Sequence, residues 1–175
     1  MKFQSFLMLI ILTSLCLGCS QQTKNLYRLE LERACVDCNL KGVNLSKQNL
    51  GTKYRLPRGS SPLSVTPFGI EEAEPVDLTR ANLTDANLFQ ADLTSVIFNE
   101  ANLQQANLSE TDLQEAQLKD SNLQAANLQQ ANLNKANLFG ANLQGADLRG
   151  AKLEETNLTG IITNEKTIWD KGSEN

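Results

Sequence analysis

Leucine recurs at every fifth position along residues 76–160. The series starts with Leu78, Leu83, Leu88 and Leu93 and runs from Leu103 to Leu158, with Phe98 in the one place between. A small residue, usually alanine, stands two places before each leucine, and Asn or Asp commonly lies between them. On an α-helix a step of five residues turns the leucine by about 140°. On a strand an odd step puts successive leucines on opposite faces. Neither regular structure therefore suits the pattern.

The conflict disappears if the chain bends once in every five residues, always in the same direction. The small residue and the leucine, two residues apart on a short extended side, then both point inward, and the other three positions point outward. Such a chain winds as a coil, with each turn stacked about 4.8 Å above the last through backbone hydrogen bonds. One coil cannot bury its own leucines, but a stack of coils buries them all. The pattern predicts an all-β solenoid.

The repeated unit Ala-(Asn/Asp)-Leu-x-x resembles the pentapeptide repeat family. The resemblance covers residues 76–160 continuously, and a weaker trace appears at Cys38-Asn39-Leu40, Val43-Asn44-Leu45 and Gln48-Asn49-Leu50. It implies a right-handed, four-sided parallel β-helix with four pentapeptides in each coil. The seventeen later repeats and three early ones would make about five coils, a rod on the order of 24 Å long at the strand spacing.

The composition limits the kinds of functional site that we expect. The chain has 175 residues and a net charge of −4, and it contains no histidine, the commonest general base and metal ligand. The charge is unevenly placed, because residues 20–58 carry eight bases against three acids, whereas residues 76–160 carry eleven acids against five bases. These features predict a basic N-terminal end, an acidic rod, no cofactor, no metal and no nucleic-acid partner.

The first 19 residues read as a bacterial export signal. Lys2 precedes an apolar run over residues 6–17, which is too short for a permanent membrane span. The run ends in Leu15-Cys16-Leu17-Gly18-Cys19, which resembles a lipobox with Cys19 as the acylated residue. The sequence thus predicts a protein exported across the cytoplasmic membrane and anchored by Cys19, facing the periplasm or, in a photosynthetic host, the thylakoid lumen.

Two segments lie between this signal and the first weak repeats. Residues 20–34 suit either a strand or a short helix, and we interpret them as a cap over the first coil. Residues 35–50 begin with Cys35 and Cys38, and counting back from Leu40 places both cysteines at inward positions. In an oxidising compartment the pair predicts a disulfide, with two buried thiols as the alternative.

The repeat register is interrupted once and then lost. Residues 51–75 contain all four prolines, and we read them as a loop that leaves the coil and is either functional or a passive flap. Residues 161–175 form a cap or tail, in which Ile168 and Trp169 would cover the last leucine layer or make a dimer contact. The family resemblance allows the second reading, since some members pair by their C-terminal ends, so we expect a monomer or an end-to-end dimer.

A period of 20 residues sorts the outward positions by side. One side stacks Asn82, Asn102, Asn122 and Asn142 beside Thr84, Gln104, Gln124 and Gln144, as an amide ladder that would stiffen the rod. Another is a candidate interaction face, interrupted by Lys135 and Lys152, and carries Asp92, Asp112, Glu115, Glu154 and Glu155. The alternative for this face is a solvated surface that keeps the rod soluble.

Three functions are compatible with these features. The first is an exported, lipid-anchored scaffold or protein-binding module that acts on an unidentified protein and has no chemistry of its own. The second, by resemblance to family members that act on DNA gyrase, is an acidic rod that mimics DNA. The third is an enzyme, which the sequence disfavours because an outward-facing rod offers no pocket to desolvate its carboxylates. The signal and Cys19 favour the first.

Overall fold

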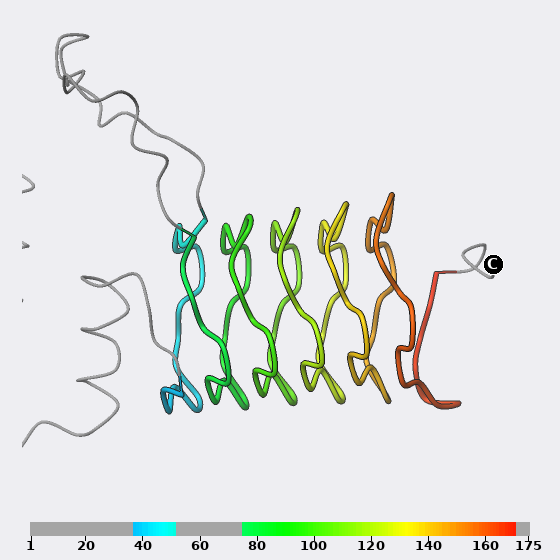
Figure 1. Ribbon diagram of the computed structural model, residues 1–175, viewed down its shortest axis with the longest axis horizontal. Coiled ribbons are helices and arrows are strands. Elements are labelled where there is room, and N and C mark those ends of the chain that lie inside the picture. Colours follow the sequence, from blue (N-terminus) through cyan, green and yellow to red (C-terminus); the bar gives the residue numbers. More distant parts are fainter. Residues whose placement is uncertain (1–36, 52–74, 171–175) are drawn as a thin grey trace, which may run out of the picture.

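The computed structural model describes residues 37–51 and 75–170, which wind into one rod of stacked coils (Figure 1). The described residues contain no α-helix, and no strand is longer than a single bridging residue. The bridging residue is the one between the small residue and the leucine, and each bridge is parallel. Bridged residues lie 20 positions apart from Asp77 to Ile162, so four pentapeptides complete one coil. The predicted stack is confirmed.

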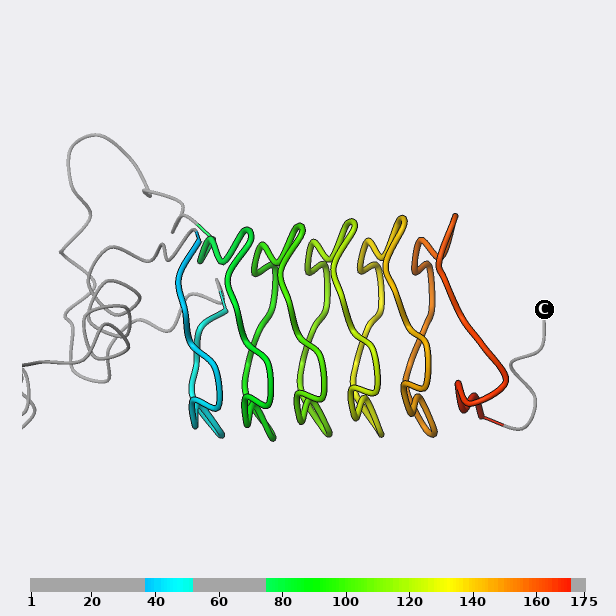
Figure 2. The ribbon, with the colours of Figure 1, turned by 90° about the horizontal axis from the view of Figure 1, so that it is seen from below.

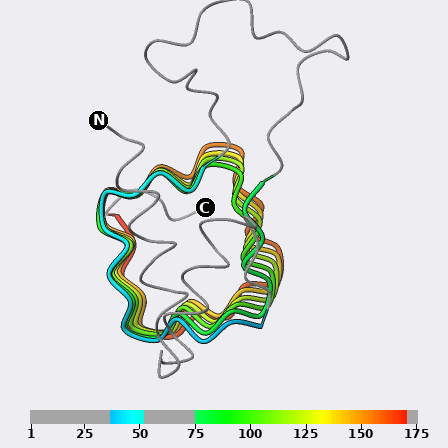
Figure 3. The same cartoon turned by 90° about the vertical axis from the view of Figure 1, so that its left-hand side faces the viewer.

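Seen along its axis, the rod has four sides on which successive coils superpose (Figure 3). We name them by their bridging residues. Face A carries Asn39, Asn82, Asn102, Asn122, Asn142 and Ile162. Face B carries Asn44, Asn87, Asn107, Asn127, Asp147 and Ile168. Face C carries Asn49, Asp92, Asp112, Asn132 and Lys152, and face D carries Asp77, Ile97, Gln117, Asn137 and Asn157.

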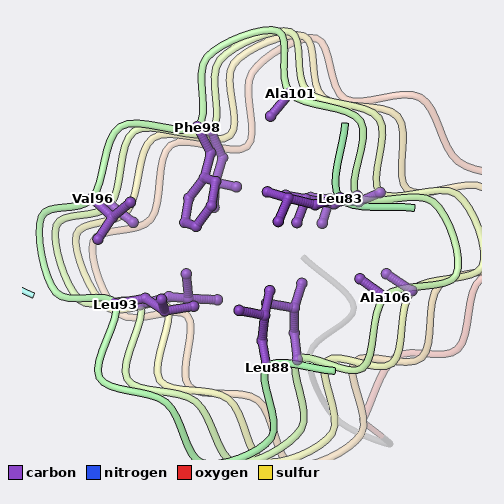
Figure 4. Close-up of a cluster of buried hydrophobic side chains, with 14 of the residues drawn as sticks. Leu83, Leu88, Leu93, Val96, Phe98, Ala101 and Ala106 are labelled. Atoms are coloured by element: carbon purple, nitrogen blue, oxygen red, sulfur yellow. The ribbon is translucent and has the colours of Figure 1, made fainter. Parts of the chain in front are cut away.

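The core is a column of leucines lined by alanines. The central residues from Leu78 to Leu148 are at most 1 % exposed, and the small residues before them are buried as well. In Figure 4, Leu83, Leu88, Leu93 and Phe98 converge from the four sides of one coil, whereas Val96, Ala101 and Ala106 lie toward its margins. Burial of each leucine removes apolar surface from water and contributes about 1.5–3 kcal/mol. Stacking therefore buries what no single coil could.

Backbone hydrogen bonds hold each coil to the next. The central residue donates its N–H to the carbonyl of the bridging residue in the next coil, at 2.6–2.9 Å, as Leu83 does to Asn102. The bridging residue of that coil donates in return to the small residue below, as Asn102 does to Ala81. The two bonds alternate along every side, so the ladder is continuous over the length of the rod.

Each corner is a β-turn closed by a bond from the small residue to the preceding leucine carbonyl, at 2.9–3.4 Å. The fifth residue of the repeat occupies the third position of this turn and has a positive φ, between 55° and 71° in residues 80–160. A positive φ at the third position is a feature of type II turns and favours glycine there. Most corners nevertheless carry a residue with a side chain, including Gln105, Glu115 and Lys135.

Replacing Gln105 with glycine is expected to raise the free energy of unfolding by about 0.5–1 kcal/mol. Gln105 has φ +59°, and a left-handed conformation strains a residue that has a Cβ. The control is Gln144→Gly, one position earlier in its repeat, where φ is not positive and glycine should destabilise by about 0.5–1 kcal/mol. Urea denaturation measures both, and equal signs for the two variants would contradict the argument.

The predicted interruption lies within the first coil. Asn39, Asn44 and Asn49 bridge to Asn82, Asn87 and Asp92, 43 positions later, whereas the other coils advance by 20. The chain therefore leaves the coil after Gly51 on face C and returns near Val76 on face D, with 23 additional residues between. The structure of residues 52–74 lies outside the described residues, as do the proposed signal at 1–19 and the cap at 20–34.

The coil also continues beyond Gly160, where the leucine spacing is lost. Ile162 bridges to Asn142 on face A, and Ile168 bridges to Asp147 on face B, one residue later than the period predicts. The side chains of Asn164 and Thr167 both accept a hydrogen bond from the Gly145 N–H. They replace the backbone carbonyl that accepts the equivalent N–H in the coil below, where Ala125 donates to Gln144. Figure 2 shows this last partial coil in red at the C-terminal end of the rod.

Candidate functional site

The outward side chains differ in chemistry from face to face. Faces A and B carry mostly amides. The amide ladder predicted on face A is present only in part, whereas face B carries a longer ladder that was not predicted. On face B, Asn127 donates to Asn107, Asn107 to Asn87 and Asn87 to Asn44, at 3.3–3.4 Å. On face A, Asn122 donates to Asn102 at 3.2 Å. Such ladders fix the amides against one another and leave little conformational freedom on these two faces.

The asparagines have a second task within their own repeat. The Oδ1 atom of Asn82 accepts the backbone N–H of Thr84 at 3.1 Å, and Asn107 does the same for Ser109 at 3.2 Å. Gln117 and Lys152 occupy the same position but do not make this bond. There the asparagine of the coil below substitutes, since Asn99 accepts from Lys119 N–H and Asn134 from Glu154 N–H. The Asn/Asp preference thus reflects the acceptor that most corners take from their own repeat.

Face C brings together the charged residues predicted to form an interaction face. Asp92 and Asp112 are bridged to each other, and Asn132 connects them to Lys152. Glu115, Lys135 and Glu155 occupy successive corners of the same face, and Glu154 precedes Glu155. All of these except the half-buried Asp92 and Asp112 are exposed. Five acids and two lysines therefore share one side of the rod.

The two aspartates of face C are partly used by the fold. Asp92 accepts the backbone N–H and the hydroxyl of Thr94 at 3.2 and 2.7 Å. Asp112 accepts the N–H of Gln114 and the Nδ2 of Asn132, at 3.2 and 3.1 Å. The side chains of Glu115, Glu155 and Lys135 make no hydrogen bond in the described part of the chain. These corner groups, rather than the aspartates, are the ones available to a partner.

A bidentate ion pair lies on face B. Arg149 binds the Asp147 carboxylate through Nε and Nη2, with the shortest bond at 2.6 Å, and Gln129 donates to the same carboxylate. Hydrogen bonding to Arg149 lowers the pKa of Asp147 to about 2, although partial burial opposes the shift. The pair belongs to the fold, because both partners lie in one repeat and Gln129 belongs to the coil below.

Asp147 is expected to make the free energy of unfolding depend on pH in the acidic range. Its pKa is lower in the folded protein than in the unfolded chain, so its contribution is present above pH 4 and is lost as the pH falls toward 2. Asp147→Asn should therefore lower the free energy of unfolding by about 1 kcal/mol at pH 7, after allowance for solvent screening at the exposed Arg149. Thermal denaturation at pH 7 and pH 2 tests this, and a difference that stays constant between them would contradict it.

Of the four cysteines, only Cys38 lies among the described residues. Cys38 is buried at the first small position of face A and is disulfide-bonded, and its partner lies outside the described residues. The pairing with Cys35 is therefore still a prediction, as is the lipid at Cys19. Among the described residues, no group of three or more His, Cys, Asp or Glu side chains is placed to hold a metal ion. No helix in the described ranges is long and apolar enough to cross a membrane.

The C-terminal end exposes apolar surface. Trp169 packs against the core together with Ala151, Leu153, Leu158 and Ile161, but all five are only partly buried. Ile168, predicted to share the capping role, has its backbone in the ladder, and the residue is 43 % exposed. Trp169 thus lies over the last layer without closing it.

Comparison with known proteins agrees with this geometry. The family model for pentapeptide repeats matches residues 86–124 and 121–160, in eight copies. A crystal structure of a pentapeptide repeat protein, Rfr23 from the cyanobacterium Cyanothece 51142, is 61% identical over 85% of this chain and 99% of its own, with a TM-score of 0.76. The chain belongs to the pentapeptide repeat family. Its fold is accordingly the right-handed quadrilateral β-helix, a repeat fold that is non-catalytic.

A second pentapeptide repeat structure is similar at a greater distance. HetL, involved in the regulation of heterocyst differentiation in the cyanobacterium Nostoc sp. strain PCC 7120, is 33% identical over 78% of this chain, with a TM-score of 0.53. The match spans 55% of HetL, about half its length. No curated protein sequence matches the chain.

Proposed function

We propose that this pentapeptide repeat protein is an exported, lipid-anchored binding module for another protein and has no chemistry of its own. The observation that carries the proposal is face C, where the fold collects Glu115, Glu154 and Glu155 with Lys135 and Lys152. Their side chains project from a rigid backbone ladder, so a partner would meet a preformed pattern of charge and little ordering would be needed on this side.

Export is supported by the N-terminal sequence. Residues 6–17 and the Cys19 motif resemble a lipoprotein signal, and an oxidised Cys38 suits an oxidising compartment. The relative with 61% identity comes from a cyanobacterium, a host in which an exported protein can face either the periplasm or the thylakoid lumen. An anchor at Cys19 would place the first coil nearest the membrane and the C-terminal end farthest from it.

The alternative is an acidic rod that binds a DNA-handling enzyme such as gyrase. Face C provides carboxylates for this role, but Lys135 and Lys152 interrupt them. The alternative also requires a cytosolic protein, which the signal opposes. An assay of DNA supercoiling by purified gyrase addresses it directly: inhibition that is lost when face C is reversed in charge would favour the alternative over the exported module.

The anchor is tested by the intact mass of the protein from its native host. A chain that begins at Cys19 and carries acyl groups is the expected result. A full-length chain without lipid, recovered from the cytosol, would refute the exported module. Alkylation before and after reduction, on the same sample, assigns the state of Cys35 and Cys38.

The binding face is tested by charge reversal at its corners. In the variant Glu115→Lys/Glu155→Lys, we expect the amount of partner crosslinked in native membranes to fall at least tenfold, because two exposed charges of the proposed contact are inverted. The matched control is Glu100→Lys/Glu110→Lys, which inverts two exposed corner residues of faces D and B with the same positive φ. Equal losses in the two variants would show that face C is not the binding face.

A further inference from the structure

The last complete coil has an open backbone edge on two of its four sides. Residues 161–170 cover faces A and B of this coil through the bridges of Ile162 and Ile168. No described residue bridges above Lys152 on face C or above Asn157 on face D. The open edge therefore follows residues 151–160, two adjacent sides of the rod.

The hydrogen bonds of the coil below show which backbone groups of this edge are without a partner coil. There Leu133, Lys135, Leu138 and Gly140 each donate an N–H upward, at 2.8–3.0 Å, and Ala131 and Ala136 each accept one bond through the carbonyl. The equivalent groups at the edge are the N–H of Leu153, Glu155, Leu158 and Gly160 and the carbonyls of Ala151 and Thr156. None of these six groups has a hydrogen-bond partner in the described part of the chain.

The apolar layer beneath this edge is also incomplete. Leu153 and Leu158 are only partly buried, whereas the central leucines from Leu78 to Leu148 are at most 1 % exposed. Trp169 and Ile161 border them on the sides that the last partial coil covers. An open edge with free donors beside uncovered leucines is a template for strand addition.

We propose that residues 151–160 bind an extended segment of a partner polypeptide, which adds two sides to the rod in parallel orientation. The segment needs two consecutive five-residue units, each with a small residue at the first position and an apolar residue at the third. Its apolar residues then cover Leu153 and Leu158, and its backbone pairs with the six open groups. This inference rests on the proposed role as a protein-binding module and names a backbone site that shares only Glu155 with the corners of face C.

Charge at the edge further restricts the segment. Lys152 stands at the bridging position, and Glu154 and Glu155 follow at the corner. In the coils below, residues at equivalent positions stack directly upon one another. The segment should therefore carry an acidic residue at its second position and a basic residue at its fourth, because opposite charges on neighbouring strands attract.

A second copy of this chain fits the edge less well. The edge has four donors and two acceptors, so an identical edge brought up to it leaves donors facing donors. The complementary edge, with four acceptors and two donors, belongs to the N-terminal side of a coil. In the first coil, however, the Thr79 carbonyl on that side already accepts the N–H of Asp37. In the sequence, the position equivalent to Leu153, counted on from Ile168, is Glu174 and not an apolar residue.

The test uses the peptide acetyl-Ala-Glu-Leu-Lys-Gly-Ala-Asn-Leu-Thr-Gly-amide and the full mature chain. We expect the amides of Leu153, Glu155, Leu158 and Gly160 to exchange at least tenfold more slowly when peptide is added, as followed by NMR. Trp169 is the one tryptophan of the chain, and its emission should shift to shorter wavelength. Linking the peptide to the C-terminus through a flexible ten-residue linker repeats the measurement at an effective concentration of about 1 mM.

Two controls distinguish strand addition from non-specific hydrophobic binding of the peptide. N-methylation of the glutamate and asparagine of the peptide removes the two donors for Ala151 and Thr156 and should weaken binding about tenfold or more. Lys152→Glu should weaken it about threefold, and a peptide with lysine at the second position should restore it. Equal binding of the methylated and unmethylated peptides would overturn the proposal.

Two further outcomes would also overturn it. One is unchanged amide exchange with both free and linked peptide. The other is a dimer in sedimentation experiments with the same four amides already protected, since the edge would then belong to a second copy. Both outcomes concern the backbone edge, whereas the charge-reversal experiment also changes Glu115, two coils below the edge. Glu115→Lys alone therefore tests face C without altering the edge, so failure at this edge and failure of the proposed function are distinguishable.

Discussion

Replacing Leu118 with alanine will lower the free energy of unfolding by about 2–5 kcal/mol. Leu118 is completely buried, and its neighbours in the stack are Phe98 in the coil below and Leu138 in the coil above. These are held in place by the backbone ladder and have little freedom to collapse into the cavity. The loss therefore includes both the transfer of the leucine side chain and most of the cavity cost. Urea denaturation followed by circular dichroism measures it.

The matched control is Leu158→Ala, at the equivalent position of face D two coils later. Because Leu158 is only partly buried at the end of the stack, its truncation should cost no more than about 1–2 kcal/mol. A cost at Leu158 equal to that at Leu118 would mean that the C-terminal layer is covered in solution, for example by another chain.

Gly51→Ala should destabilise the protein by about 1–3 kcal/mol. A Cβ at Gly51 would lie 2.9 Å from the backbone nitrogen of Thr94 and would also strike the Asp92 carboxylate. The carboxylate could rotate only by giving up its bonds to Thr94, and the backbone nitrogen is fixed by the coil. The first coil would have to separate from the second at the point where residues 52–74 begin. Thermal denaturation measures the effect.

Gly42→Ala separates this steric clash from backbone strain. Gly42 has φ +66°, but a Cβ there would meet nothing within 4 Å. Alanine should therefore cost only the strain of a left-handed conformation, about 1 kcal/mol. If Gly42→Ala lowers the free energy of unfolding as much as Gly51→Ala does, close packing around Gly51 does not explain why a glycine is needed at position 51.

The sequence predicted the parts of the fold that depend on the period alone. The period of five identified the inward residues, and the period of 20 assigned Asp92, Asp112, Glu115, Glu154 and Glu155 to one face. The period of five follows from simple counting, whereas the period of 20 also needs the four-sided coil that the family resemblance implies. The interaction role of that face has no such basis in the pattern, and it stays a prediction.

The sequence did not predict the places where a different residue takes over a role in the repeat. Residues 161–170 lack the leucine spacing, yet Ile162 and Ile168 continue the ladder because backbone bonds do not depend on side-chain identity. Asn99 and Asn134 serve the coil above only because Gln117 and Lys152 do not supply the usual acceptor. The open edge at residues 151–160 became visible only when the donors of each coil could be matched with their acceptors.

The 23-residue interruption has a consequence for how such a rod can diversify. The chain leaves and rejoins the same coil, and the bridges on either side remain in register. A corner can thus accept an insertion without displacing the coils that follow, since each coil is stabilised by its immediate neighbours. Appendages of unrelated sequence could be gained, exchanged or lost at corners during evolution while the supporting column stays unchanged.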